Sequence, residues 1–234
     1  MDILLGSKEL TTPKTQVRRM SMVLWGPSGA GKTTLAATAP GPLLWCNFDP
    51  DGTSSLGDRE DIYIADYSMD NPNVVTRFKQ DNCAGIKTLL EEHPEMATLQ
   101  GYGRRNSYTM QGVMSFIKAT GAYNKHCIII AHEDAPQKDE MTGAMMVSIL
   151  VGGKMQSEIP IKLSEVWHLE DNGKDRKITI RANRMKKPMK SRMFKMDKDT
   201  SFSWNYNPED WSGDGIAAWY NAWVANNGKK IDLP

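Results

Sequence analysis

Cysteine is scarce in this chain, with three residues among 234. Three thiols cannot all pair, and Cys46 and Cys127 lie within apolar runs, which favours reduced, buried thiols over disulfides. Neither the cysteines nor the four histidines have a spacing typical of a zinc site. The scarcity therefore predicts a reducing compartment and argues against a small domain that depends on disulfides or zinc.

Long hydrophobic runs and an excess of one charge are also lacking. No run approaches the roughly 18 apolar residues of a membrane span, and residues 1–20 hold no apolar stretch long enough for a signal peptide. Twenty-nine basic and 28 acidic residues leave a net charge of +1, so nucleic-acid or membrane binding would require local clusters. We therefore expect a soluble, cytoplasmic protein with no membrane partner.

Short β-rich runs recur along the chain, and the earlier ones alternate with helical segments. The runs cover residues 21–25, 43–48, 61–66, 126–131, 165–169 and 177–181. This alternation predicts an α/β fold with a mainly parallel sheet flanked by helices. Between the last two runs, Asn172-Gly173 is typical of a tight turn and predicts a C-terminal hairpin.

Two segments have the apolar spacing of a helix that packs on one face. In residues 105–119 the stripe consists of Met110, Val113, Met114 and Ile117. In the tryptophan-rich tail it consists of Ile216, Trp219, Tyr220 and Trp223. The second stripe predicts a helix docked on the core, with base stacking as the alternative. We divide the chain into an N-terminal segment (1–17), a core (18–198) and this tail (199–234).

Residues 26–33 match the phosphate-loop pattern G-x-x-x-x-G-K-[ST] in full, between an apolar run and a helix-forming segment. Glycines let consecutive backbone N–H groups converge on phosphate oxygens. We expect Lys32 to reach the β- and γ-phosphates of ATP and the Thr33 hydroxyl to ligate Mg²⁺. An ordinary glycine turn is the alternative, which the strand–loop–helix context disfavours. The predicted nucleotide-binding residues are Gly26, Pro27, Ser28, Gly29, Ala30, Gly31, Lys32, Thr33 and Thr34.

A second buried strand that ends in a magnesium-orienting aspartate usually accompanies such a loop, and it is not legible here. Residues 61–66 end in Asp66, but they are short and half polar, which is typical of an edge strand. Residues 91–106 stand where the buried strand is expected. Their apolar run, residues 96–99, is too short and no aspartate follows it.

Over roughly residues 18–195, the order of these elements resembles the RecA-like ATPase core. It is most similar to small phage-encoded ATP-binding proteins of the recombinase and single-strand-annealing group, which consist essentially of that core. The resemblance implies a RecA-like P-loop NTPase fold and an ATPase that acts on single-stranded DNA in recombination or annealing. It also implies homo-oligomers, a single-strand binding protein as a further partner, and the cytoplasm of a bacterial host.

The resemblance assigns further roles near the nucleotide. In "LLWCNFDPDGTSSL", residues 43–56, Asp51 takes the place of the carboxylate that activates the attacking water, and Asp49 supports it at the metal. A plain turn is the equally good alternative, because Asp-Pro-Asp-Gly is also turn chemistry. His132 corresponds to the polar residue that senses the γ-phosphate at a strand end, with a merely solvated histidine as the alternative.

Basic residues supply the remaining assignments. Residues 181–195 contain seven basic residues and no acid. Within them, Arg184 corresponds to an arginine finger that reaches the nucleotide of a neighbouring subunit, so that Lys32, Asp51 and Arg184 form the expected catalytic set. The candidates for contacts with DNA phosphates are Arg104, Arg105, Lys154, Lys186, Lys187, Lys190 and Arg192. Solvated charged loops are the alternative, and around Lys154 a partly buried apolar flap.

The resemblance places the magnesium-orienting strand within residues 91–106, a stretch that looks shortened. A natural deletion, an engineered or mosaic sequence, and substitution by Asp66 are the three explanations. The first two leave phosphate binding largely intact but weaken magnesium placement and hydrolysis. Two other functions stay open: a nucleotide-dependent adaptor with little or no hydrolysis, and a small-molecule or nucleotide kinase. The absence of arginine from residues 134–160 argues against the kinase.

Overall fold

A computed structural model gives the fold of this chain in the parts described below. It describes residues 4–5, 8–9, 18–49, 51–66, 114, 117–118, 120–121, 125–138, 140, 143–151, 155–182, 189–195, 201–206 and 212–234. The predicted helix over residues 105–119 lies largely outside these residues, and the shortened stretch at 91–106 lies entirely outside them.

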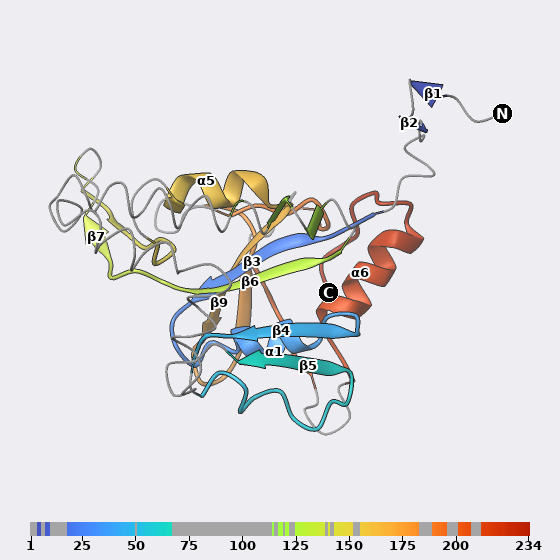
Figure 1. The fold of residues 1–234 in the computed structure, drawn as a ribbon. Helices are drawn as coiled ribbons and strands as arrows, with labels where there is room; N and C mark the ends of the chain where they lie inside the picture. Colours follow the sequence, from blue (N-terminus) through green and yellow to red (C-terminus); the bar gives the residue numbers. More distant parts are fainter. Residues whose placement is uncertain are drawn as a thin grey trace, which may run out of the picture.

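A five-stranded mixed sheet forms the centre of the fold, in the order β11–β10–β9–β3–β6 (Figure 1). The neighbours of β3 (Ser21–Gly26), β6 (Cys127–His132) and β9 (Glu165–Asp171), run parallel to it. β10 (Arg176–Thr179) and β11 (Ser201–Ser203) extend the sheet in antiparallel fashion. The α/β class and the C-terminal hairpin agree with the sequence. The sheet is mixed, with two parallel and two antiparallel pairings, and its β6–β3–β9 core is compatible with the predicted parallel sheet.

The antiparallel half begins at the predicted hairpin. Asn172 Oδ1 accepts hydrogen bonds from the backbone N–H groups of Lys174 and Asp175, at 3.0 and 2.7 Å. Gly173 has a φ of 80°, a left-handed conformation that favours glycine. A turn this short returns the chain beside the strand it has just left, so β10 pairs with β9 in the antiparallel direction.

Helices lie on both sides of this sheet, and Figure 1 shows α5 (Met155–Lys162) across the sheet from α1 (Lys32–Ala37). α6 (Ile216–Ala225) lies on the α1 side, where its apolar stripe joins the core that also contains α1 residues. None of the helices in the described part of the chain is long and apolar enough to cross a membrane.

The alternation of side chains along β3 divides the interior into two cores. Met22 and Leu24 pack in the core with α1 and α6, whereas Val23 and Trp25 pack in the core with α5. All four side chains are at most 1% exposed. Because successive side chains of a strand point to opposite faces, an unbroken apolar run is what a central strand covered on both faces requires.

The C-terminal helix α6 is docked on the core, as its tryptophan spacing predicts. Ile216 and Trp219 are 0% and 6% exposed. The N–H of Ile216 donates to Thr38 Oγ1 at 2.8 Å, and the N–H of Ala217 donates to the Thr38 carbonyl at 3.0 Å. The start of α6 is therefore tied to the residue that ends α1, and Trp219 is not accessible for base stacking.

Other strands pair outside the five-stranded sheet. They are the antiparallel pairs β1 (Leu4–Leu5) with β2 (Lys8–Glu9) and β7 (Gln137–Lys138) with β8 (Met145–Met146), and the parallel pair β4 (Leu43–Asn47) with β5 (Ile62–Asp66). Arg59 connects the β4–β5 pair to α1, since it forms an ion pair with Asp61 and donates to the Ala37 carbonyl. Within the described residues, β4 and β5 are hydrogen-bonded as strands only to each other.

A buried carboxylate, Glu165, fastens a second chain segment to the start of β9. Its Oε2 accepts hydrogen bonds from Ser191 Oγ at 2.5 Å and from Trp167 Nε1 at 2.9 Å. Its Oε1 accepts from the backbone N–H groups of Arg192 and Met193 at 2.8 and 3.2 Å. Glu165 is 2% exposed, and burial raises the pKa of its carboxyl group while these donors oppose that rise.

The two cysteines in the described residues are free thiols. Cys127 is buried, as predicted, but Cys46 on β4 is only half-buried, which corrects the expectation of a buried thiol there. Burial raises the pKa of both thiols, which disfavours the reactive thiolate.

Candidate functional site

The glycine loop runs from the end of β3 to the start of α1, in the context that the sequence predicts. Gly29 and Gly31 have φ angles of 78° and 81°. An added Cβ at Gly29 would meet nothing within 4 Å, so the tip of the loop is open. An added Cβ at Gly31 would lie 3.2 Å from the Trp204 ring, over which the Arg176 guanidinium sits at 5.6 Å. The loop is therefore open at its tip and supported at its base by the β10–β11 side of the sheet.

Gly26 begins the loop in close contact with the neighbouring strand. An added Cβ would lie 2.2 Å from the backbone carbonyl oxygen of Leu169 on β9, and the φ of Gly26 is 150°. Real Cβ atoms do not approach backbone oxygen this closely, so glycine is required by both space and conformation. This position holds the loop against β9.

We predict that Gly26→Ala destabilises the protein by about 3 kcal/mol or more, because left-handed strain and overpacking add. Gly29→Ala is the matched control, since it introduces the same methyl group at a positive φ but in open space, and we expect about 1 kcal/mol. Urea unfolding curves of the two variants and the wild type measure the difference. Equal losses for the two variants would contradict the close contact at Gly26.

Lys32 is the first residue of α1 and is only 6% exposed. Its Nζ donates to the carbonyls of Gly26 and Pro27, at 2.9 and 2.5 Å. Burial lowers the pKa of Lys32, and the nearby Glu133 carboxylate partly offsets this effect. A buried ammonium group held on neutral carbonyls at the base of a glycine loop with an open tip is suited to receive an anion.

The parallel strands bring further polar residues to the same edge of the sheet. His132 lies in register with Gly26 across the β3–β6 pair, and His168 lies in register with Trp25 across the β3–β9 pair. Glu133, the residue after β6, donates its backbone N–H to the Gly26 carbonyl at 3.2 Å. The carboxyl ends of parallel strands are where ligands collect in open α/β sheets.

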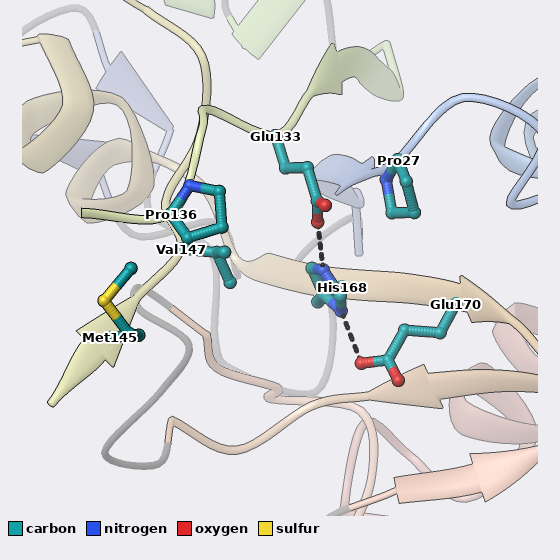
Figure 2. Close-up of a pocket in the computed structure, with 7 residues that line it drawn as sticks. All are labelled: Pro27, Glu133, Pro136, Met145, Val147, His168 and Glu170. Atoms are coloured by element: carbon teal, nitrogen blue, oxygen red, sulfur yellow. Dashed lines mark hydrogen bonds and ion pairs between the residues drawn. The ribbon is translucent and has the colours of Figure 1, made fainter. Parts of the chain in front are cut away.

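His168 lies between two carboxylates at this edge (Figure 2). Its Nε2 is 3.0 Å from Glu133 Oε2, and its Nδ1 is 3.2 Å from Glu170 Oε1. The imidazole is 1% exposed and packs edge-on against Trp25, with the ring centroids 4.4 Å apart.

A pocket of about 240 Å³ opens beside this group (Figure 2). Its walls come from the loop, the residues after β6, the β7–β8 pair and β9: Pro27, Glu133, Pro136, Met145, Val147, His168 and Glu170. Most of the lining is apolar, and the ionisable side chains gather on one wall. The pocket therefore adjoins the glycine loop and joins it to the segment that follows His132.

Sequence reasoning did not identify Glu133, His168 or Glu170. Glu133 follows the predicted sensor His132 directly, and this adjacency was the available signal. His168 stands inside the apolar run of β9, where a buried polar residue needs partners. Their meeting depends on the register between β6, β3 and β9, which a single sequence does not specify.

The acidic candidates of the sequence lie around the β4–β5 pair. Asp49 and Asp51 are exposed in the turn after β4, where Asp49 Oδ1 accepts the backbone N–H of Asp51 at 3.2 Å. This is the turn chemistry offered as the alternative reading. Asp66 ends β5, and Asn47 Nδ2 donates to its Oδ1 at 3.0 Å.

Only two of the basic candidates, Lys190 and Arg192, lie among the described residues. Arg104, Arg105, Lys154, Arg184, Lys186 and Lys187 lie outside the described residues. Lys190 is half-buried, exchanges backbone hydrogen bonds with Val166 at 3.1 and 2.9 Å, and places Nζ 3.4 Å from the Ile161 carbonyl. Arg192 is exposed. Of these two, Arg192 is the more accessible to a DNA phosphate.

The loop fits an anion such as a phosphate group, because a buried ammonium lies at the base of a glycine loop whose tip is open. Magnesium would be held mainly by the phosphates and the Thr33 hydroxyl. In the described ranges, no cluster of three or more His, Cys, Asp or Glu residues is placed to hold a metal ion alone. Magnesium usually takes one or two carboxylates in addition to phosphates, so a single neighbouring carboxylate is sufficient.

Comparison with known proteins adds no further assignment: no protein-family model matches the chain, and no curated protein matches it.

Proposed function

We propose that this protein is a RecA-like P-loop ATPase that binds ATP with magnesium and acts on single-stranded DNA, in recombination or strand annealing. The observation that carries the proposal is the Lys32 amine, buried at the base of an open glycine loop at the carboxyl ends of parallel strands. A nonspecific glycine turn gives no reason to bury an ammonium group in this way.

The proposed roles combine the geometry of the loop with the assignments that the resemblance implies. Lys32 and the loop N–H groups bind the phosphates, and bound magnesium neutralises the charge that develops on them. His132, in register with Gly26 across the β3–β6 pair, is proposed to sense the terminal phosphate. Asp51 is proposed to orient the attacking water, with Asp49 as its support, and Arg184 of a neighbouring subunit to stabilise the transferring phosphate. The last role requires homo-oligomers.

DNA binding is proposed to use the basic cluster at 181–195, with exposed Arg192 as its described representative. Such contacts read the backbone, so the affinity for single strands is expected to be independent of sequence and to fall with salt. A single-strand binding protein is the proposed further partner, and the cytoplasm of a bacterial host is the proposed location.

The test measures ATP binding and phosphate release together, with and without single-stranded DNA. We expect micromolar-range binding and phosphate release that DNA increases. Binding without release, with or without DNA, would favour a nucleotide-dependent adaptor instead. Absence of binding to both ATP and GTP would overturn the proposal, and phosphate transfer to a nucleoside or nucleotide without DNA would favour a kinase.

A further inference from the structure

Glu133 is placed as the partner carboxylate of the glycine loop. Its backbone N–H and the Lys32 Nζ donate to the same acceptor, the carbonyl of Gly26, at 3.2 and 2.9 Å. The backbone of the acidic Glu133 and the side chain of the basic Lys32 are therefore both bound to one carbonyl at the beginning of the loop. Glu133 follows β6, a strand parallel to β3, and the carboxyl ends of such strands are where a magnesium-nucleotide would be met.

The two oxygens of Glu133 have different surroundings. Oε2 is 3.0 Å from His168 Nε2. Oε1 makes no hydrogen bond or ion pair to any residue that the structure describes, and the side chain is 26% exposed where it lines the pocket beside Pro27. Figure 2 shows Glu133 directed at His168, with Glu170 holding the other side of the ring. One oxygen is anchored and the other is accessible.

We propose that Glu133 is the carboxylate that orients the water shell of the phosphate-bound magnesium, and that His168 is its positioning residue. The inference rests on the proposed function, because the magnesium arrives with the nucleotide. Magnesium keeps several waters and is usually bound through one or two carboxylates besides phosphates. An accessible carboxylate oxygen at the loop would supply this carboxylate.

The surroundings of His168 suit a positioning role. The ring is buried, packed on Trp25 and contacted at both nitrogens, so its orientation is fixed by the fold. A fixed ring holds Glu133 Oε2 and leaves Oε1 without a hydrogen bond or ion pair to the described residues. Groups that orient a metal-binding carboxylate in this way change metal affinity by about 10–100-fold when they are removed.

The other acidic candidates are less well placed for this role. Asp66 is hydrogen-bonded to Asn47 within the β4–β5 pair, and Asp49 caps the backbone of Asp51 in an exposed turn. Neither β4 nor β5 is hydrogen-bonded to β3 in the described part of the chain, whereas Glu133 is bonded to the last residue of β3 itself.

The experiment titrates magnesium into the full chain with a fluorescent ATP analogue, after binding is measured in EDTA. We expect Glu133→Gln to bind the analogue in EDTA as tightly as the wild type or more tightly, because a charge that repels the phosphates is removed. The magnesium concentration at half-effect should rise about 10–100-fold. A general folding defect would weaken binding of the analogue both in EDTA and in magnesium. Unchanged or tighter binding in EDTA, together with a higher magnesium midpoint, therefore identifies a role in magnesium binding.

Three variants complete the test. Asp134→Asn removes the neighbouring acid and should leave the magnesium midpoint unchanged. His168→Gln should raise the midpoint while EDTA binding persists. Glu133→Asp, which keeps the charge but shortens its reach, should raise it less and decides the matter if Glu133→Gln does not fold. An unchanged midpoint in the Glu133 variants, or an equal rise in Asp134→Asn, would overturn the inference, whereas a wild type that binds no analogue in EDTA or magnesium would overturn the proposed function itself.

Discussion

Lys32→Ala is expected to reduce ATP affinity by at least about 30-fold, the equivalent of losing about 2 kcal/mol or more of a desolvated charge contact. The amine is 6% exposed and donates only to the Gly26 and Pro27 carbonyls among the described residues, so its positive charge is available to a phosphate. Isothermal titration calorimetry or equilibrium dialysis with ATP and magnesium measures the change.

The matched control is Lys125→Ala. It deletes an exposed lysine that precedes β6, at the opposite end of that strand from the glycine loop. Both substitutions change the net charge equally. A loss of ATP affinity that depends on the position of the charge should therefore appear only in the Lys32 variant. Equal affinity for the wild type and Lys32→Ala would contradict a phosphate site at this loop.

Glu165→Ala should give the largest loss of folding stability, about 3–5 kcal/mol. The substitution removes the one carboxylate that accepts from four donors and leaves these donors without an acceptor. In a chain of this length the melting temperature should fall by roughly 10 °C. The stability of Glu165→Gln should lie between those of the wild type and Glu165→Ala. Its one remaining side-chain oxygen can accept from some of the donors, whereas its NH₂ group cannot accept from the others. Differential scanning calorimetry gives the ranking.

Glu60→Ala is the control for this substitution. Glu60 is exposed, and a change of the same chemistry at an exposed position should alter stability by less than about 0.5 kcal/mol. If Glu165→Ala had the same melting temperature as the wild type, the buried carboxylate would not hold the segment around Ser191 on β9.

Much of the strand framework is predictable from local pattern. The runs at 21–25, 126–131 and 165–169 become β3, β6 and β9 within one or two residues, because short apolar runs fit strands that are buried in a sheet. The turn at Asn172-Gly173 and the glycine loop are equally local signals. That turn also predicts the antiparallel pairing of β9 with β10, whereas the further pairing of β10 with β11 has no such local signal.

The wall of ionisable residues beside the loop is not predictable in this way. Glu133 and His168 are 35 residues apart and meet because β6 and β9 flank β3 on opposite sides. Glu165 likewise takes three of its donors from residues 191–193. Strand order and register decide both arrangements, and these depend on packing over the whole sheet rather than on neighbouring letters.

The contact between Gly31 and the Trp204 ring makes the loop spectroscopically visible without any label. The indole is fully buried and lies against the base of the loop. Indole emission depends on its immediate surroundings, so binding of a phosphate ligand at the loop is expected to change the intensity or wavelength of tryptophan emission. Occupancy and its kinetics then become readable in real time by stopped-flow fluorimetry on unmodified protein.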